Sequence, residues 1–291
     1  MKPTVTPSNP QKVLFPEDGI TKGDLIAYYA RVASAMLPHV RGRIVTMERY
    51  PDGIAAQRFF QKNVPAYFPE WIRTVPVEKR GGRLRQLVIE NAETLAYLAN
   101  QACVTIHVWP SRCDRPHHPD RILFDIDPPD DDFVPVRQAA RVIRGILEGV
   151  GLTPYVMTTG SRGLHVAAAL DRRSDFERAR AFAVRVAQLT VAAAPSRFTI
   201  EPRKDQRGGR VFIDYLRNAY AQHGVAPYSV RARPGAPVAT PLAWEELDDP
   251  RLHARRFTLS NLFRRLARRA DPWKEIGRAK GSLERALRAL P

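Results

Sequence analysis

The chain has little cysteine and no long hydrophobic run. Only Cys103 and Cys113 occur among 291 residues, and their spacing is not the C-x-x-C of a zinc site or that of a disulfide framework. No stretch approaches the roughly 20 apolar residues that a membrane span requires, and the N-terminus lacks the apolar region of a signal peptide. We therefore expect a soluble protein of the reducing cytoplasm, without a membrane partner.

Acidic residues are scarce relative to basic ones. The sequence has 30 Asp and Glu against 46 Lys and Arg, a formal net charge of +16. This excess favours a polyanionic partner such as nucleic acid, because neutralising phosphates releases counterions. A chain that is basic only for solubility is the alternative. The hydrophobic content of 44% allows a sizeable core, in one large domain or two lobes.

Hydrophobic periodicity predicts helices and short strands in alternation. Helices are expected near 21–37, 92–100, 134–149 and 174–194, with an Arg-rich helical end from about 251, and strands at 44–49, 86–90, 104–109, 121–127, 155–158, 164–170, 210–215 and 228–233. No clear linker divides the chain. The pattern indicates an α/β or α+β fold with mixed or antiparallel sheets and helices packed outside.

Three aspartates end two of the predicted strands. Asp125 and Asp127 close the run from Arg121, and Asp214 closes the run from Arg210. Residues i and i+2 of a strand share a face, so Asp125 and Asp127 present two carboxylates side by side. A D-x-D pair is common, however, and often marks only a solvated strand end. The following Asp130-Asp131-Asp132 is read as a solvated turn and helix cap.

Three such carboxylates suit a divalent cation. Mg²⁺ and Mn²⁺ prefer hard oxygen ligands with positions left for water and phosphate oxygens. In a two-ion scheme, one ion activates a primer 3′-hydroxyl and the other neutralises the triphosphate and the leaving pyrophosphate. Without a cation these carboxylates would repel one another, so we expect a destabilised or partly protonated site.

A glycine-rich turn, Thr159-Gly160-Ser161-Arg162-Gly163-Leu164-His165, separates two predicted strands. Glycines allow the backbone to approach a phosphate, and the Ser161, Arg162 and His165 side chains can donate hydrogen bonds to its oxygens. A plain hairpin turn followed by a buried histidine is an equally good reading.

Other candidates have ordinary structural explanations as well. His107 lies on an apolar strand, either as a buried hydrogen-bonded residue or as a phosphate or sugar contact. Arg231 and Arg233 would share one face of a strand and bind a triphosphate, or remain solvated. Phe59 and Phe60 would stack on bases or belong to the core.

The sequence resembles the polymerase domain of bacterial ligase D, an archaeo-eukaryotic-primase-type enzyme, and its stand-alone relatives. The matching segments cover nearly the whole chain: Lys12-Val13-Leu14-Phe15-Pro16, Asn91-Ala92-Glu93-Thr94-Leu95, Ile106-His107-Val108-Trp109-Pro110, Asp214-Tyr215 and Ala226-Pro227-Tyr228-Ser229-Val230-Arg231. The resemblance implies a single primase-type polymerase domain over 1–291, with two sheet-based lobes and the active site between them. Its parts would be a 5′-phosphate-contacting segment (about 1–40), a catalytic core (41–240) and the Arg-rich helical end (241–291).

The resemblance also implies roles for individual residues. Asp125, Asp127 and Asp214 would bind two catalytic metal ions, Mn²⁺ or Mg²⁺. The nucleotide pocket would consist of His107, Thr159, Ser161, Arg162, His165, Arg231 and Arg233. Lys12 and Lys22, which otherwise look like surface lysines, would hold a downstream 5′-phosphate, and Phe59 and Phe60 would contact the template. Relatives often have Ser at position 159 and Lys at 162, which affects the expected sugar preference and affinity.

The function implied is template-directed extension of a primer 3′-hydroxyl with NTPs or dNTPs, preferring ribonucleotides and Mn²⁺, at breaks or short gaps bearing a 5′-phosphate. A separate DNA ligase and Ku are the expected partners in non-homologous end joining, and the expected location is the nucleoid. One alternative is a non-catalytic module that binds 5′-phosphorylated DNA ends and recruits a ligase. A metal-dependent nuclease is another, because such enzymes also use clustered carboxylates.

Overall fold

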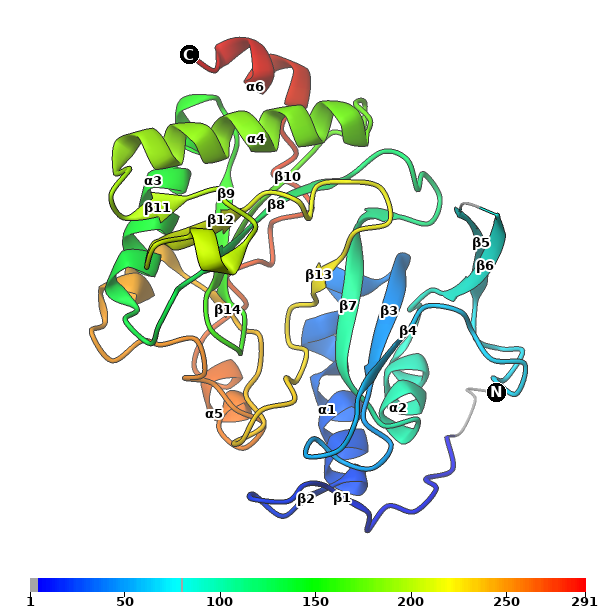
Figure 1. The fold of residues 1–291 in the computed structure, drawn as a ribbon. Helices are drawn as coiled ribbons and strands as arrows, with labels where there is room; N and C mark the ends of the chain where they lie inside the picture. The colour runs from blue at the N-terminus through cyan, green and yellow to red at the C-terminus, as the bar shows by residue number, and fades with distance from the viewer. Residues whose placement is uncertain (1–4, 80) are drawn as a thin grey trace.

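The structure, a computed structural model, describes residues 5–79 and 81–291. Two β-sheets, each covered by helices, form two lobes that lie side by side in Figure 1. The first lobe is the sheet β13-β7-β3-β4 with helices α1 and α2, and the second is the sheet β11-β12-β8-β10-β9-β14 with helices α3 and α4. The predicted mixed fold of sheets with outer helices is confirmed.

The first lobe is an antiparallel sheet backed by two helices. Its strands are β13 (Gly224–Val225), β7 (Cys103–Arg112), β3 (Arg43–Arg49) and β4 (Phe59–Gln61). Helices α1 (Lys22–Val40) and α2 (Ala92–Asn100) bury Met36 and Leu95 against Val45 and Ile106. The Tyr29 hydroxyl donates a 2.8 Å hydrogen bond to the Val104 carbonyl, which satisfies a polar group inside this core.

The second lobe has a larger sheet that is antiparallel except at one edge. Its strands are β11 (Phe198–Thr199), β12 (Val211–Asp214), β8 (Arg121–Asp127), β10 (Leu164–Ala169), β9 (Pro154–Thr158) and β14 (Pro241–Leu242), and only the β11–β12 pair is parallel among those described. Helices α3 (Val134–Gly149) and α4 (Phe176–Ala193) cover one face. Phe124 and Ile126 meet Ile143 and Phe182 in the core between them.

Shorter elements complete the chain. They are β1 (Val13–Phe15), β2 (Ile20–Thr21), β5 (Thr74–Lys79), β6 (Gly82–Leu87), the 3₁₀ helices η1 (Lys204–Gln206) and η2 (Trp244–Asp248), α5 (Leu262–Leu266) and α6 (Leu283–Ala289). In Figure 1 the segment between α5 and α6 runs from the lower part of the second lobe to the top of the molecule. None of the described helices is long and apolar enough to span a bilayer.

Local sequence signals explain the long helices. The predicted capping box at the start of α1 is present: the Asp24 backbone N–H donates to the Thr21 hydroxyl, and the Thr21 N–H donates to the Asp24 carboxylate, at 3.2 and 2.8 Å. Helices α2 and α3 begin and end at the predicted residues. Helix α1 continues to Val40, beyond the predicted end near residue 37, and Pro38 lies inside it.

Several predicted boundaries are wrong. Helix α4 is capped by Asp175 rather than Ser174, whose hydroxyl donates to Glu284 instead. The strand predicted at 86–90 is displaced, because β6 covers Gly82–Leu87. From residue 251 onward the described chain contains only α5 and α6 as helices, since Pro272, Gly277 and Gly281 interrupt it.

The strand predicted at 228–233 is also wrong. Tyr228 follows a proline and has a positive φ of 66°, which turns the chain out of an extended path. In the described chain this segment forms only an isolated bridge between Val230 and Val238. Arg231 and Arg233 therefore do not share a strand face.

Candidate active site

The three aspartates meet at the edge of the second lobe. Strands β8 and β12 pair antiparallel with Asp214 opposite Asp125, so the two carboxylates come from adjacent strands. Asp125 and Asp127 lie on one face of β8, while Ile126 between them is fully buried on the other. The predicted arrangement on the strands is confirmed, and Pro128 ends β8 directly after the pair.

The aspartates have unequal pKa values because their surroundings differ. The charge of Asp125, aided by burial, raises the pKa of Asp127 well above the usual range of an aspartate. Burial also raises the pKa of Asp214. For Asp125, burial opposes ionisation but His165 and Arg217 outweigh it, so its pKa is lowered. These opposite directions agree with the expectation that the carboxylates repel one another without a cation.

Arg217 supplies positive charge to this cluster, and we did not predict it from the sequence. Its Nε lies 3.2 Å from the Asp214 carboxylate and 3.7 Å from that of Asp125. Among residues 5–79 and 81–291, no group of three or more His, Cys, Asp or Glu side chains is arranged closely enough to hold a metal ion. The guanidinium lies against two of the carboxylates instead. Its position three residues after Asp214 is the sequence feature from which this ion pair could have been predicted.

The glycine-rich turn is both a hairpin turn and a wall of the site. It connects β9 to β10, and the Thr159 hydroxyl accepts hydrogen bonds from the backbone N–H groups of Ser161 and Gly163. Gly160 has a φ of 66°, and a Cβ there would lie 2.9 Å from the Ala239 backbone nitrogen. A Cβ at Gly163 would lie 1.7 Å from the carbonyl oxygen of Ile126, so only glycine fits.

His165 and Arg162 point from this turn in different directions. On β10, His165 faces Asp125 across the strand pair, with Nε2 3.3 Å from the carboxylate oxygen. Arg162 is exposed and donates a 2.9 Å hydrogen bond to the carbonyl of Pro129. Its guanidinium is therefore held beside the end of strand β8, next to the aspartates.

The first lobe contributes a buried network around Glu48, which was also missed. Glu48 on β3 is 2.8 Å from the Tyr50 hydroxyl, 2.6 Å from Arg58 and 3.1 Å from Nε2 of His107 on β7. Burial opposes ionisation of Glu48, but these partners, His107 first, lower its pKa to about 2. The sequence feature that could have revealed this network is the acidic Glu48 inside a strand predicted to be apolar. Burial, and then the nearby His107, lowers the pKa of His223 to about 3.

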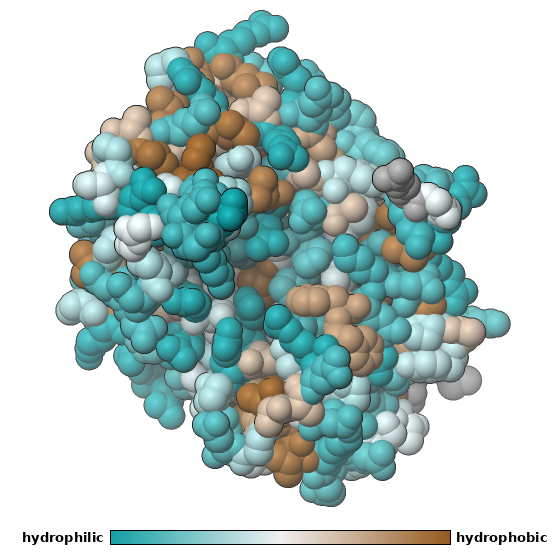
Figure 2. All heavy atoms as spheres, in the orientation of Figure 1, coloured by the Kyte–Doolittle hydropathy of each residue, from teal (hydrophilic) through white to brown (hydrophobic). Residues whose placement is uncertain are grey.

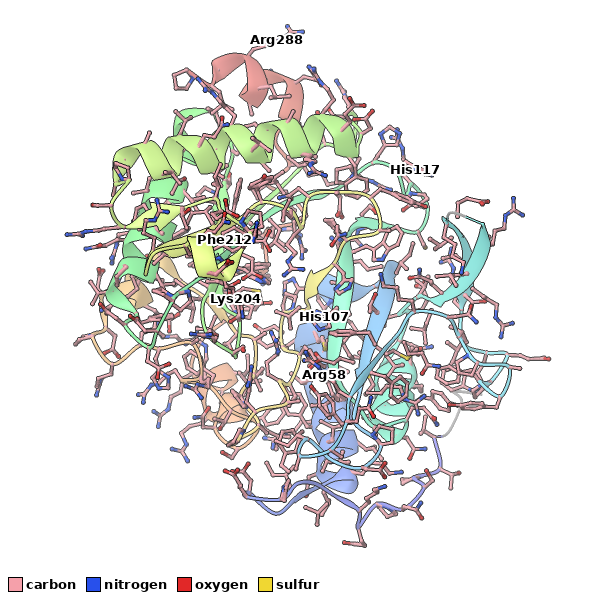
Figure 3. All side chains as sticks on the ribbon, viewed as in Figure 1. Arg58, His107, His117, Lys204, Phe212 and Arg288 are labelled. Carbon is pink, nitrogen blue, oxygen red and sulfur yellow. The ribbon has the colours of Figure 1, made fainter. Side chains whose placement is uncertain are left out.

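These groups line one cavity of about 260 Å³ between the lobes. Figure 3 shows Arg58 and His107 on the first lobe and Phe212 on the second. The lining residues are Glu48, Arg58, Phe60, His107, Asp125, Asp127, Thr159, Ser161, Arg162, His165, Arg217, His223, Gly224, Val225 and Arg231. The predicted nucleotide residues therefore come together, except Arg233. Arg233 lines a neighbouring cavity of about 340 Å³, which shares Glu48, Arg58 and Arg231 with the first.

The predicted DNA-contacting residues lie on two separate surfaces. Phe59 and Phe60 on β4 are 42% and 48% exposed, so they are not core residues, and the Phe60 ring is 5.8 Å from that of His107. Lys12 and Lys22 lie near each other, and burial and the charge of Lys12 lower the pKa of Lys22. Lys12 pairs with Asp52 at 2.8 Å, and Lys22 donates to the Ser8 hydroxyl at 3.0 Å. Lys22 is thus buried rather than an ordinary surface lysine.

Comparison with known proteins identifies the family. The sequence profile of the LigD primase-polymerase domain matches residues 21–273. The chain belongs to this family. The LigD primase-polymerase assignment makes it a nucleotidyltransferase of the primase-polymerase type, with the fold expected from the resemblance.

LigD relatives match over most of this chain. The multifunctional non-homologous end joining DNA repair protein LigD of Mycobacterium tuberculosis is 36% identical over 276 residues, covering 92% of this chain and 36% of that protein. The bifunctional LigD of Bacillus subtilis is 32% identical, covering 92% of this chain and 43% of that protein. The chain thus spans roughly a third to two fifths of these relatives. The polymerase domain of M. tuberculosis Ligase D, solved in complex with DNA, is 34% identical with a TM-score of 0.89, covering 96% of this chain and 99% of that one.

Proposed function

We propose that this chain is a template-directed polymerase that extends a primer 3′-hydroxyl at double-strand breaks or short gaps in DNA. The observation that supports it most is the cavity in which Asp125 and Asp127 face a basic glycine-rich turn, with Asp214 opposite Asp125 on the paired strand. Acidic and phosphate-binding groups in one cavity suit a triphosphate substrate better than a nuclease. The related proteins named for non-homologous end joining, and the relative solved with DNA, support the DNA substrate.

Asp125, Asp127 and Asp214 are the residues that would hold two divalent ions, Mn²⁺ by preference. Their hard oxygen donors and negative charge suit such a cation. In the described structure they are not close enough together to hold one, and Arg217 lies against two of them, so a bound ion would take the place of its guanidinium and draw the carboxylates together. When bound, the ions neutralise triphosphate charge and favour the deprotonated 3′-hydroxyl. The aspartates orient the reacting groups from two paired strands whose backbones are fixed, so little reorganisation is needed.

The hydrogen-bond donors that line the cavity bind the nucleotide. Ser161, Arg162, His165 and Arg231 donate to phosphate oxygens, while Thr159 holds the shape of the turn through its two backbone hydrogen bonds. His107, held by its hydrogen bond with Glu48, contacts the sugar of the nucleotide, and ribonucleotides are the preferred substrates. Arg233 extends the same basic surface into the neighbouring cavity.

DNA would be held at two separate surfaces. Lys12 and Lys22, in the N-terminal part at about 1–40, bind the downstream 5′-phosphate. Phe59 and Phe60, exposed residues of the core at 41–240, stack on the template, and Phe60 also lines the cavity. The Arg-rich part at 241–291 adds positive charge. A separate ligase and Ku would complete end joining, with the protein associated with the nucleoid.

Primer extension on gapped DNA tests this proposal. The wild type and Asp125→Ala are each given a labelled primer that faces a short gap, with or without a downstream 5′-phosphate. NTPs and dNTPs are compared in the presence of Mn²⁺. We expect extension by the wild type only, faster with NTPs and with the phosphate. If neither protein extends and both bind the phosphorylated end equally, the chain is a non-catalytic end-binding module.

The 5′-phosphate site has its own test. Replacing Lys12 and Lys22 together by Ala should remove the stimulation by the 5′-phosphate and leave extension of a simple primer-template largely intact. Exposed Lys204, outside this region, gives the matched control Lys204→Ala. Equal loss of extension on both substrates would contradict the role of the two lysines.

A further inference from the structure

A second cavity, of about 230 Å³, lies at the other end of strand β8 from the aspartates. It is nearly as large as the active-site cavity and shares no lining residue with it. Six of its lining residues are cations: Arg43, Arg112, Arg121, Arg172, Lys274 and Lys280. They come from both lobes and from the segment between α5 and α6, whose course Figure 1 shows.

The carboxylates at this cavity pair with only some of its cations. Asp120 accepts hydrogen bonds from Arg43 at 2.7 and 2.8 Å and from Arg112 at 2.8 Å. Asp114 pairs with Arg172 at 2.8 and 2.9 Å. Two carboxylates thus engage three arginines. The side chains of Lys274 and Lys280 make no hydrogen bond or ion pair within residues 5–79 and 81–291, and both are exposed.

Arg121 has the least favourable environment of these cations. It is only 8% exposed, and across the described parts of the chain its guanidinium forms neither a hydrogen bond nor an ion pair. The guanidinium lies over the Trp273 ring, 5.5 Å from its centroid, and the charge of Asp120 acts on it favourably without a direct ion pair. Burial, together with the charge of Arg43, lowers the pKa of Arg121 to about 9. An unpaired buried cation costs free energy unless an anion accompanies it.

We propose that this cavity is a binding site for a small phosphate anion, inorganic phosphate or pyrophosphate, with Arg121 at its base and Lys274 and Lys280 at its mouth. The buried Nε of Arg172, which also has no partner among the described residues, is a further free donor at this site. The anion would bridge the two lobes and the C-terminal segment. This site does not depend on the polymerase activity.

A free anion fits the cavity better than a DNA backbone does. The duplex backbone presents its phosphates to exposed side chains, whereas Arg121 is buried beside Trp273, which is 1% exposed. The lysines are exposed and Arg112 and Arg172 are partly exposed, but Arg43 and Arg121 are buried, so a ligand must enter the cavity to reach them.

The test compares the thermal unfolding of four proteins in pyrophosphate, in phosphate and in sodium chloride of equal ionic strength, all without divalent ions. They are the wild type, Arg121→Met, the double variant Lys274→Ala/Lys280→Ala, and Arg180→Met as a control for an exposed arginine on α4. Pyrophosphate should raise the melting temperature of the wild type and of Arg180→Met by about 4 °C more than chloride does. Arg121→Met should lose this response, yet without the anion it should melt at or above the wild-type temperature, since it lacks the unpaired charge.

Calorimetric titration with pyrophosphate then assigns the site. We expect binding at least about tenfold weaker in Arg121→Met and in the double lysine variant, and unchanged binding in the exposed control Arg180→Met. The proposal is overturned if Arg121→Met binds as the wild type does, or if binding is lost in Arg231→Met, which would place the anion in the active-site cavity. Weaker duplex DNA binding by the lysine variant, with no pyrophosphate binding by the wild type, would assign the surface to DNA. If Arg121→Met does not fold, the lysine variant decides the question.

Discussion

The two ends of strand β8 carry charge imbalances of opposite sign. At its C-terminal end, Asp125 and Asp127 crowd against Asp214, with Arg217 beside them. At its N-terminal end, Arg121 is buried beside Arg43, and Asp120 is already shared by two arginines. Both ends are fixed by hydrogen-bonded strands, so neither imbalance can relax by moving the backbone.

The difference lies in how the imbalance is reduced within the protein. At the acidic end, Arg217 is partly exposed and comes from the turn after β12, so the counter-charge is on a side chain that can be displaced. At the basic end, the counter-charge is a carboxylate held by three hydrogen bonds, and Arg121 has no partner among the described residues. The first arrangement suits exchange of a cation during turnover, and the second suits retention of an anion. Figure 2 shows that the face viewed there is mostly hydrophilic, consistent with a protein that handles charged ligands.

The largest expected effect comes from neutralising the acidic end. Asp127→Asn should lower primer extension in Mn²⁺ by on the order of 10³-fold, because one ligand of the proposed cations is lost. The metal-free variant should nevertheless melt about 3 °C higher than the wild type, because the repulsion from Asp125 is removed. Measuring the extension rate and the melting temperature on one preparation checks both the predicted loss of activity and the predicted gain of stability. Loss of activity together with a lower melting temperature would contradict the claim that repulsion among the aspartates destabilises the metal-free protein.

A second prediction is that His223, unlike the charged residues of the active-site cavity, is neutral in the folded protein. Burial lowers its pKa to about 3 from the ordinary 6.5, so the folded protein holds it neutral. Below pH 6.5 the unfolded chain binds a proton that the folded chain does not. The stability from neutral His223 is therefore complete above pH 6.5 and lost as the pH falls towards 3. Between pH 7.5 and 5, His223→Asn should lose about 2 kcal/mol less free energy of unfolding than the wild type.

Denaturant unfolding at several pH values measures this difference. The matched control is His117→Asn, since His117 is exposed and lies outside the cavity. Parallel pH profiles for the wild type and His223→Asn would mean that folding does not lower the pKa of His223, which would contradict its burial as a neutral residue.

The smallest effect is expected at Arg217. Arg217→Met should lower the metal-free stability by about 1 kcal/mol, a modest value because the side chain is 35% exposed and solvent screens its ion pairs. Mn²⁺ should restore that loss by replacing the missing positive charge. A melting temperature that falls and is not recovered in Mn²⁺ would mean that Arg217 is a structural residue only.

The sequence was sufficient to predict those features that depend on a short-range pattern of residues. Alternating strand geometry predicted that Asp125 and Asp127 share a face, and the apolar spacing of α3 gave its bounds. It was insufficient to predict contacts between segments that are distant in the chain. Glu48 and Arg217 are common residue types, and their roles depend on the pairing of β3 with β7 and on the turn after β12. Likewise, the alternation around Arg231 resembles a strand, but Tyr228 with its positive φ turns the chain there.

Manganese binding tests the central claim most directly. The Mn²⁺ signal in electron paramagnetic resonance should show ion binding by the wild type that tightens with a non-hydrolysable NTP. In the double variant Asp125→Asn/Asp127→Asn that binding should be at least about tenfold weaker, while Arg121→Met, altered only at the opposite end of β8, should bind as the wild type does. Equal Mn²⁺ binding by the wild type and the double aspartate variant would contradict the assignment of the metal site to these carboxylates.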